Sequence, residues 1–119
     1  MATQAFTKAL LSGSTNGKGI KVTGTSTAGT VTLHTAVSGT SSMDEIWLYC
    51  RNNHTVPVTV TLEWGSSSTD DNIIWTSLPI KTGRILLVDG ALLQNSLTVK
   101  AFASVANVTF IEGFVNQIV

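Results

Sequence analysis

Short segments that alternate apolar and polar residues follow one another along the chain, separated by turn signals. The clearest, VPVTVTLEW at 56–64, gathers valines, Leu62 and Trp64 on one face and threonines and Glu63 on the other. Such alternation is the pattern of a half-buried β-strand, and no segment keeps a helical period. Strands are therefore predicted at 20–25, 30–37, 45–52, 56–64, 73–80, 83–90, 96–104 and 107–115, and at 7–12, where one helical turn is the alternative.

These eight or nine short strands, rich in threonine and valine, predict an all-β protein. We expect a single antiparallel β-sandwich or jelly-roll-like domain that spans residues 1–119. Residues 1–17 form either an N-terminal strand or a docking arm, because MATQAFTKALL is apolar and precedes the flexible SGSTNG. Only ANV at 106–108 separates the last two strands, so we expect them to pair as a hairpin.

Two of the predicted strands are apolar on both faces. In EIWLYC, Trp47 and Tyr49 alternate with aliphatic residues, and in VTFIEGFV two phenylalanines alternate with Ile111 and Val115. A strand of a two-layer sandwich has only one inner face, so the second apolar face needs another cover. We expect that cover to be a neighbouring chain or a folded-over loop. The candidate contact residues are Trp47, Tyr49, Phe110, Ile111 and Phe114.

The low charge of the chain favours association. Hydrophobic residues make up 43% of the chain, charged residues only 12%, and the net charge is zero. No basic run is present to neutralise phosphates, so we expect no nucleic-acid partner. No apolar stretch reaches the roughly 18 residues needed to span a bilayer, so we expect no membrane partner. The N-terminal sequence lacks the pattern of a secretory signal, and we expect synthesis in a cytoplasm.

The reactive side chains do not form a catalytic pattern. His34 on a threonine-rich strand face and His54 in a turn are each expected at the surface, without a nearby nucleophile. Cys50 is the only cysteine and is expected to be a buried, inert thiol. Asp70 and Asp71 lie in a polar loop that lacks a complete calcium-loop pattern. We therefore predict no catalytic residue, no cofactor and no metal site.

Two glutamates lie inside predicted strands. Glu63 is expected to face water. Glu112 lies between two phenylalanines, and if that face is buried its carboxylate needs a partner. Arg51, Arg84 or Lys100 could supply it, in an ion pair that is structural or part of an interface.

The order of several segments resembles a group of small virion-associated proteins of tailed bacteriophages. The most specific pieces are IKVTGT followed by GTVTLHTA, then LEWG, and VKAFASVANVTFIEGFVN near the end. These are strand and turn signatures, and the resemblance spans nearly the whole chain. None is a catalytic motif, so no functional residue is carried over from the family.

The resemblance implies a non-enzymatic structural protein located in the virion. The first expectation is a capsid decoration or cement protein that binds the major capsid protein on the outer shell and stabilises it. Such proteins are often trimers, so the resemblance also implies a homo-oligomer. The alternatives are a structural protein of the head–tail junction, collar or tail, and, from a different class, a carbohydrate-binding module that uses Trp47, Tyr49 or Trp75.

Overall fold

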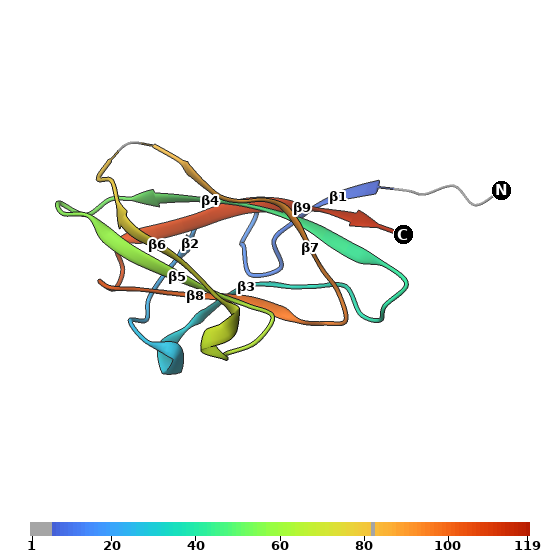
Figure 1. Ribbon diagram of the computed structural model, residues 1–119. Helices are drawn as coiled ribbons and strands as arrows, with labels where there is room; N and C mark the ends of the chain where they lie inside the picture. Colours follow the sequence, from blue (N-terminus) through green and yellow to red (C-terminus); the bar gives the residue numbers. More distant parts are fainter. Residues whose placement is uncertain (1–5, 82) are drawn as a thin grey trace.

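The computed structural model describes residues 6–81 and 83–119, and within them nine strands form two antiparallel sheets packed face to face (Figure 1). This confirms the predicted all-β sandwich. Two 3₁₀ turns, η1 (Thr27–Gly29) and η2 (Thr69–Asp71), interrupt the connections. The strands are β1 (Phe6–Leu10), β2 (Ile20–Lys21), β3 (Val31–Thr35), β4 (Met43–Asn52), β5 (Val58–Trp64), β6 (Asn72–Leu78), β7 (Ile85–Leu93), β8 (Thr98–Ala103) and β9 (Thr109–Ile118).

The pairing of the strands is nested. We call sheet A the layer with order β1-β9-β4-β7, in which β2 also pairs with β9, and sheet B the layer with order β3-β8-β5-β6. Strand β2 pairs with β9, β3 with β8, β4 with β7, and β5 with β6. A long antiparallel ribbon rolled across two layers produces this order, which is that of a jelly roll.

The expected hairpin between the last two strands is wrong. Strand β8 pairs with β3 and β5 in sheet B, whereas β9 pairs with β1, β2 and β4 in sheet A. The connection crosses between the layers, with Asn107 at a positive φ of 67° and its N–H donating to the Val22 carbonyl. Crossing places both strands inside a sheet, where each can pair along both of its edges.

The core lies between the two sheets and follows the alternation of the sequence. Leu48 of β4, Leu62 of β5 and Ile111 of β9 are all 0% exposed. Their neighbours along each strand point to the opposite face, because successive side chains alternate across a pleated strand. The inner faces therefore bury the aliphatic residues, and the outer faces carry the side chains that alternate with them.

The N-terminal segment is a strand where it is described. Strand β1 pairs antiparallel with β9, from Phe6 opposite Ile118 to Leu10 opposite Phe114. All five of its residues are exposed. The structure thus has a strand where the helical turn was the alternative, and residues 1–5 of the expected strand or arm lie outside the described residues.

The connection from β1 to β2 closes one side of the sandwich. Leu11 is 1% exposed, and the next two residues reach across to sheet B. The Gly13 N–H donates to the Leu33 carbonyl, and the Thr35 N–H donates to Ser12 Oγ. A Cβ at Gly13 would overlap the Thr32 carbonyl oxygen, so only glycine lets the two chains approach this closely. The free edge of β3 is covered in this way.

Candidate interaction surface

The aromatic residues of β4 and β9 lie together on the outer side of sheet A. Trp47 pairs with Phe114 across the two strands, and Arg51 pairs with Phe110. Tyr49 lies between them, opposite Glu112. Trp47, Tyr49 and the two phenylalanines are each partly exposed. We define the aromatic face as the outer surface formed by Trp47, Tyr49, Phe110 and Phe114 together with Arg51, Arg84 and Glu112.

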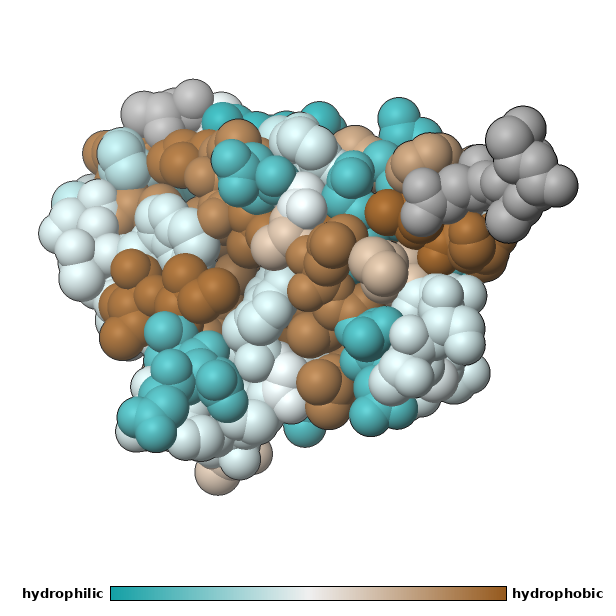
Figure 2. Space-filling model, turned by 45° about the vertical axis from the view of Figure 1, so that its right-hand side comes forward, coloured by the Kyte–Doolittle hydropathy of each residue, from teal (hydrophilic) through white to brown (hydrophobic). Residues whose placement is uncertain are grey.

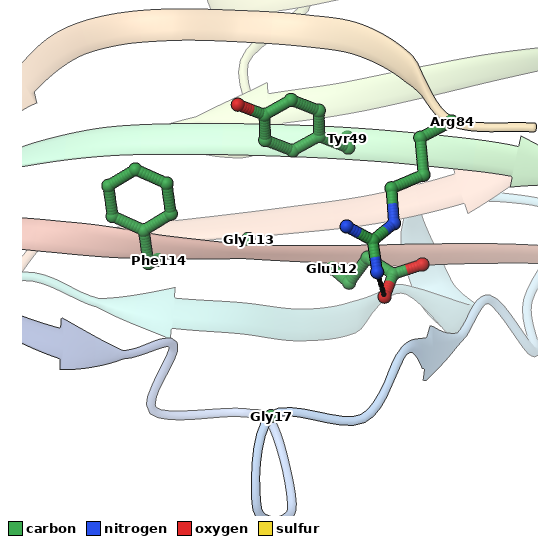
Figure 3. A pocket seen from close by; sticks show the side chains of 6 residues that line it. All are labelled: Gly17, Tyr49, Arg84, Glu112, Gly113 and Phe114. Carbon is green, nitrogen blue, oxygen red and sulfur yellow. Dashed lines mark hydrogen bonds and ion pairs between the residues drawn. The ribbon is translucent and has the colours of Figure 1, made fainter.

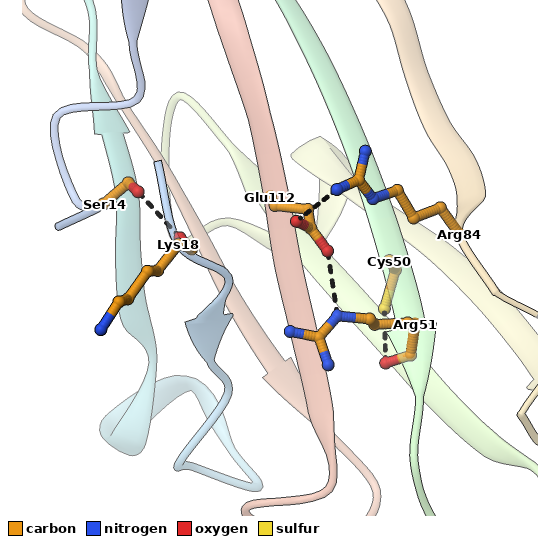
Figure 4. Close-up of polar contacts among 6 residues, drawn as sticks. All are labelled: Ser14, Lys18, Cys50, Arg51, Arg84 and Glu112. Atoms are coloured by element: carbon orange, nitrogen blue, oxygen red, sulfur yellow. Dashed lines mark hydrogen bonds and ion pairs between the residues drawn. The ribbon is translucent and has the colours of Figure 1, made fainter. Parts of the chain in front are cut away.

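Glu112 is the centre of the charge pattern on the aromatic face (Figure 4). Arg51 Nε donates to Glu112 Oε1 at 2.9 Å, and an Arg84 terminal nitrogen donates to Oε2 at 3.0 Å. The Glu112 side chain is only 13% exposed. Two of the three expected partners are therefore confirmed, whereas Lys100 lies on sheet B. Each carboxylate oxygen accepts a charge-assisted bond, which fixes both guanidinium groups.

Stacking orders the aromatic rings. The rings of Trp47 and Phe114 lie with centroids 6.0 Å apart and planes within 10° of each other. Lys8 Nζ lies 4.4 Å from the centroid of the Phe114 ring, and the Arg51 guanidinium carbon lies 4.7 Å from that of Phe110. Both distances are within the range of cation–π attraction. The rings are thus held in place before any partner binds.

Hydrogen bonds fix the orientation of the Trp47 indole. Its Nε1–H donates to Glu45 Oε1 at 2.8 Å, and the same oxygen accepts from Asn116 Nδ2 at 3.0 Å. These two bonds, that from Trp47 foremost, lower the pKa of the Glu45 carboxyl. On the other side the indole lies against Gly90 of β7, where an added Cβ would meet the ring at 3.0 Å. Trp47 is therefore enclosed by both neighbouring strands.

A hollow of about 230 Å³ opens beside the aromatic rings (Figure 3). Tyr49 and Phe114 flank it, and the Arg84 side chain extends over Glu112 at one end. Gly113 and Gly17 complete its lining. A flat apolar group can stack on the aromatic rings, while the charged groups beside them form hydrogen bonds to it. Both a protein side chain and a sugar ring meet these requirements.

Ile111 corrects the expected contact surface. Its side chain is 0% exposed and belongs to the core, because alternation along β9 turns it away from Phe110. Trp47, Tyr49, Phe110 and Phe114 are on the outer side, as the contact-surface prediction requires. The charged members, Arg84 above all, were not among the predicted contact residues. The signal in the sequence for these charged residues was Glu112, whose position between Phe110 and Phe114 requires a positively charged partner.

The prediction of an exposed His34 is wrong. A register shift between Thr32 and His34 breaks the alternation of β3, so that His34 turns inward and is 5% exposed. Its Nδ1 accepts the Ser12 backbone N–H at 3.0 Å, and its Nε2 lies 2.7 Å from Asp44 Oδ2. Nε2 therefore carries the hydrogen and donates to Asp44. Ser12 contributes its amide, not its hydroxyl, to the imidazole, so the three residues do not form a nucleophilic triad.

The His34–Asp44 pair joins the two sheets, and its loss should be costly. In Asp44→Ala the buried His34 Nε2–H and the Val37 N–H, which also donates to Oδ2 at 3.2 Å, lose their acceptor. We expect the free energy of unfolding to fall by about 3 kcal/mol or more. Urea denaturation followed by tryptophan fluorescence measures this. The matched control, Asp89→Ala at an exposed position, should change stability by less than about 0.5 kcal/mol. If Asp44→Ala and Asp89→Ala lowered stability equally, the buried hydrogen bonds assigned to Asp44 would be contradicted.

Glu63 is also buried, contrary to the expectation that it faces water. It is 2% exposed and lies on the outer side of sheet B between Asn72 of β6 and Lys100 of β8. The turn η2 also contacts β5. Among the described residues, neither Glu63 Oε2 nor Asn72 Oδ1 has a hydrogen-bond partner. No group of three His, Cys, Asp or Glu side chains within this part of the chain is placed to hold a metal ion.

Cys50 is buried, as predicted, and should be unreactive in the folded protein. It is 0% exposed, and burial raises the pKa of its thiol to about 12. A shift from the ordinary value of 9.0 lowers the thiolate fraction at pH 8 about a thousandfold. We expect a chromogenic disulfide reagent to label Cys50 only after addition of urea. Rapid labelling of the native protein would contradict this placement.

Comparisons with known proteins do not identify a relative. No protein-family model matches the chain, and neither a curated protein nor a solved structure is significantly similar to it. Within the described residues, no helix is long and apolar enough to cross a membrane.

Proposed function

We propose that this chain is a non-enzymatic structural protein of a tailed-bacteriophage virion, and that it decorates the capsid. The observation that carries the proposal is the aromatic face. Tryptophan, tyrosine and arginine are the residue types that dominate the binding energy of protein interfaces, and the aromatic face contains all three. Here they are fixed by Glu112 and by stacking, so that binding would cost little additional side-chain entropy.

Two further features support the same proposal. The first is the expectation, drawn from the segments IKVTGT, GTVTLHTA, LEWG and VKAFASVANVTFIEGFVN, that the chain is a small virion-associated protein. The nested strand order is that of jelly rolls, which are common in viral capsid domains. A fold hosts many functions, so this second point is an analogy. In the proposed role, the aromatic face docks on the major capsid protein and helps to hold neighbouring capsid subunits together.

Quantification of the chain in purified particles tests the proposal. DNA-filled particles are banded on a density gradient, and the amount of this chain is compared with that of the major capsid protein. A copy number comparable to that of the major capsid protein is expected for a decoration protein. A small fraction of that number would instead place the chain at the head–tail junction, collar or tail. Absence from the particles would refute a virion role.

The hollow beside Tyr49 and Phe114 favours a second candidate function, which is glycan binding. A sugar ring can stack on an aromatic side chain while Arg84 and Glu112 bond its hydroxyl groups. Trp75, the third aromatic residue expected in a sugar platform, packs instead against the core from β6. Titration of the protein with a panel of mono- and oligosaccharides, followed by its tryptophan fluorescence, tests this candidate. Quenching that disappears in Tyr49→Ala would favour glycan binding over capsid decoration.

A further inference from the structure

Strand β6 forms an open edge of sheet B (Figure 1). Within the described residues it pairs with β5 on one side and with no strand on the other. Its register with β5 is regular from Asn72 to Trp75. The backbone of these residues therefore presents N–H and C=O groups to which another strand can bond.

Two apolar side chains of β6 are also exposed, one on each face of the strand. Ile74 is 56% exposed and its neighbour Ile73, which points to the opposite face, is 36% exposed. Figure 2 shows hydrophobic residues at the surface in several separate groups, with hydrophilic residues between them. Most exposed apolar residues of a soluble protein need no explanation. On β6, however, Ile73 and Ile74 lie beside an unpaired backbone edge. One added strand would pair with this edge and contact both side chains.

The other edge strands carry charges, register shifts or a cover, whereas the only irregularity of β6 in its pairing with β5 is the shift between Val58 and Val60. The edge of β3 is met by Ser12 and Gly13. Strand β1 carries Lys8, and β7 carries Asp89 and two register shifts relative to β4. Charges and bulges of this kind prevent pairing between edges. The sequence NIIWTSLPI at 72–80 contains no charged residue.

We propose that β6 pairs antiparallel with β6 of a second copy of this chain, so that sheet B continues across a two-fold axis. An open edge requires a partner that is itself an extended strand. Pairing with an identical strand brings every residue opposite another uncharged residue, so no like charges meet. An antiparallel pair of identical strands is self-complementary and closes as a dimer. The aromatic face lies on the other sheet, so this contact is separate from the proposed capsid-binding surface.

Sedimentation equilibrium over a range of protein concentrations tests the proposal. The wild-type chain should show a concentration-dependent monomer–dimer equilibrium. Ile74→Lys should weaken dimerisation by about tenfold or more, because it places a charged side chain on the paired edge strand, where the second copy would desolvate it. The matched control, Val56→Lys, replaces a residue that is 49% exposed in a loop and should dimerise as the wild type does. A wild-type chain that stays monomeric, or that forms trimers or open-ended aggregates, would overturn the proposal.

Single-cysteine variants locate the axis. Each residue from 72 to 76 is replaced by cysteine in turn, and only a residue close to the two-fold axis can form a disulfide with its own copy. Cys50 is buried and should not interfere. We expect strong cross-linking at one of these positions. A dimer that persists without any of these cross-links would show that another surface mediates it. Incorporation of Ile74→Lys into particles tests the virion role separately.

Discussion

Replacement of Gly113 by alanine is expected to reduce the free energy of unfolding by more than about 4 kcal/mol. Gly113 of β9 lies opposite Leu48 of β4, at the centre of sheet A. A Cβ there would overlap the Trp47 carbonyl oxygen and lie 3.2 Å from Leu48 Cα. Both atoms belong to the backbone, so no side-chain rotation can relieve the overlap. The two strands with the most extensive pairing in the sheet would have to separate.

Gly29→Ala is the matched control for this substitution. A Cβ at Gly29 would meet Gly24 Cα at 3.3 Å, in an exposed turn that can shift by a few tenths of an ångström. We expect it to lower stability far less than Gly113→Ala does. Circular dichroism and urea denaturation of both variants measure the difference. A Gly113→Ala protein with nearly wild-type stability would show that β4 and β9 approach less closely than described.

Replacement of Trp47 by alanine is expected to weaken binding to particles by about 30-fold or more. Trp47 stacks on Phe114, and its indole N–H bonds to Glu45, so its ring is fixed and partly exposed at one end of the aromatic face. Removal of a pre-ordered aromatic anchor from an interface typically costs at least about 2 kcal/mol. Co-sedimentation of purified chain with particles that lack it gives the affinity directly. This prediction depends on the proposed virion function.

Phe102→Ala is the control for Trp47→Ala. Phe102 is a partly buried aromatic residue of β8 in sheet B, away from the aromatic face. Its removal should leave particle binding within about threefold of the wild type, provided that circular dichroism shows a folded protein. Equal losses in the two variants would mean that the aromatic face is not the docking surface. Binding by Trp47→Ala at wild-type strength would have the same meaning.

The candidate surface could be predicted only in part. Alternation alone separated Trp47 and Tyr49 from the core residues around them, because the direction of a side chain is a local property of a pleated strand. It left Arg51, Arg84 and Lys100 as possible partners of Glu112, and the choice among them depends on the pairing of β4 with both β7 and β9. Ile111 was wrongly included among the contact residues. The alternation of the sequence already placed its side chain on the other face of the strand from Phe110.

The buried polar groups show where local patterns fail. His34 was expected at the surface because it alternates with Leu33, but the register shift in β3 turns both residues inward. Glu63 follows the expected alternation and still lies buried, between Asn72 of β6 and Lys100 of β8. A bulge and the cross-strand neighbours of a residue both depend on segments that are distant in the sequence.

The sequence by itself determined that this chain is an all-β sandwich, that Leu48 and Leu62 face the core, and that Cys50 is buried. These features follow from the period of two, which each segment carries independently of its neighbours. Only the tertiary structure decided that the last two strands belong to different sheets, that His34 pairs with Asp44, and that β6 is an edge strand of sheet B. Strand order and register are set by contacts between segments far apart in the chain, and a local pattern contains no record of the partner it will meet.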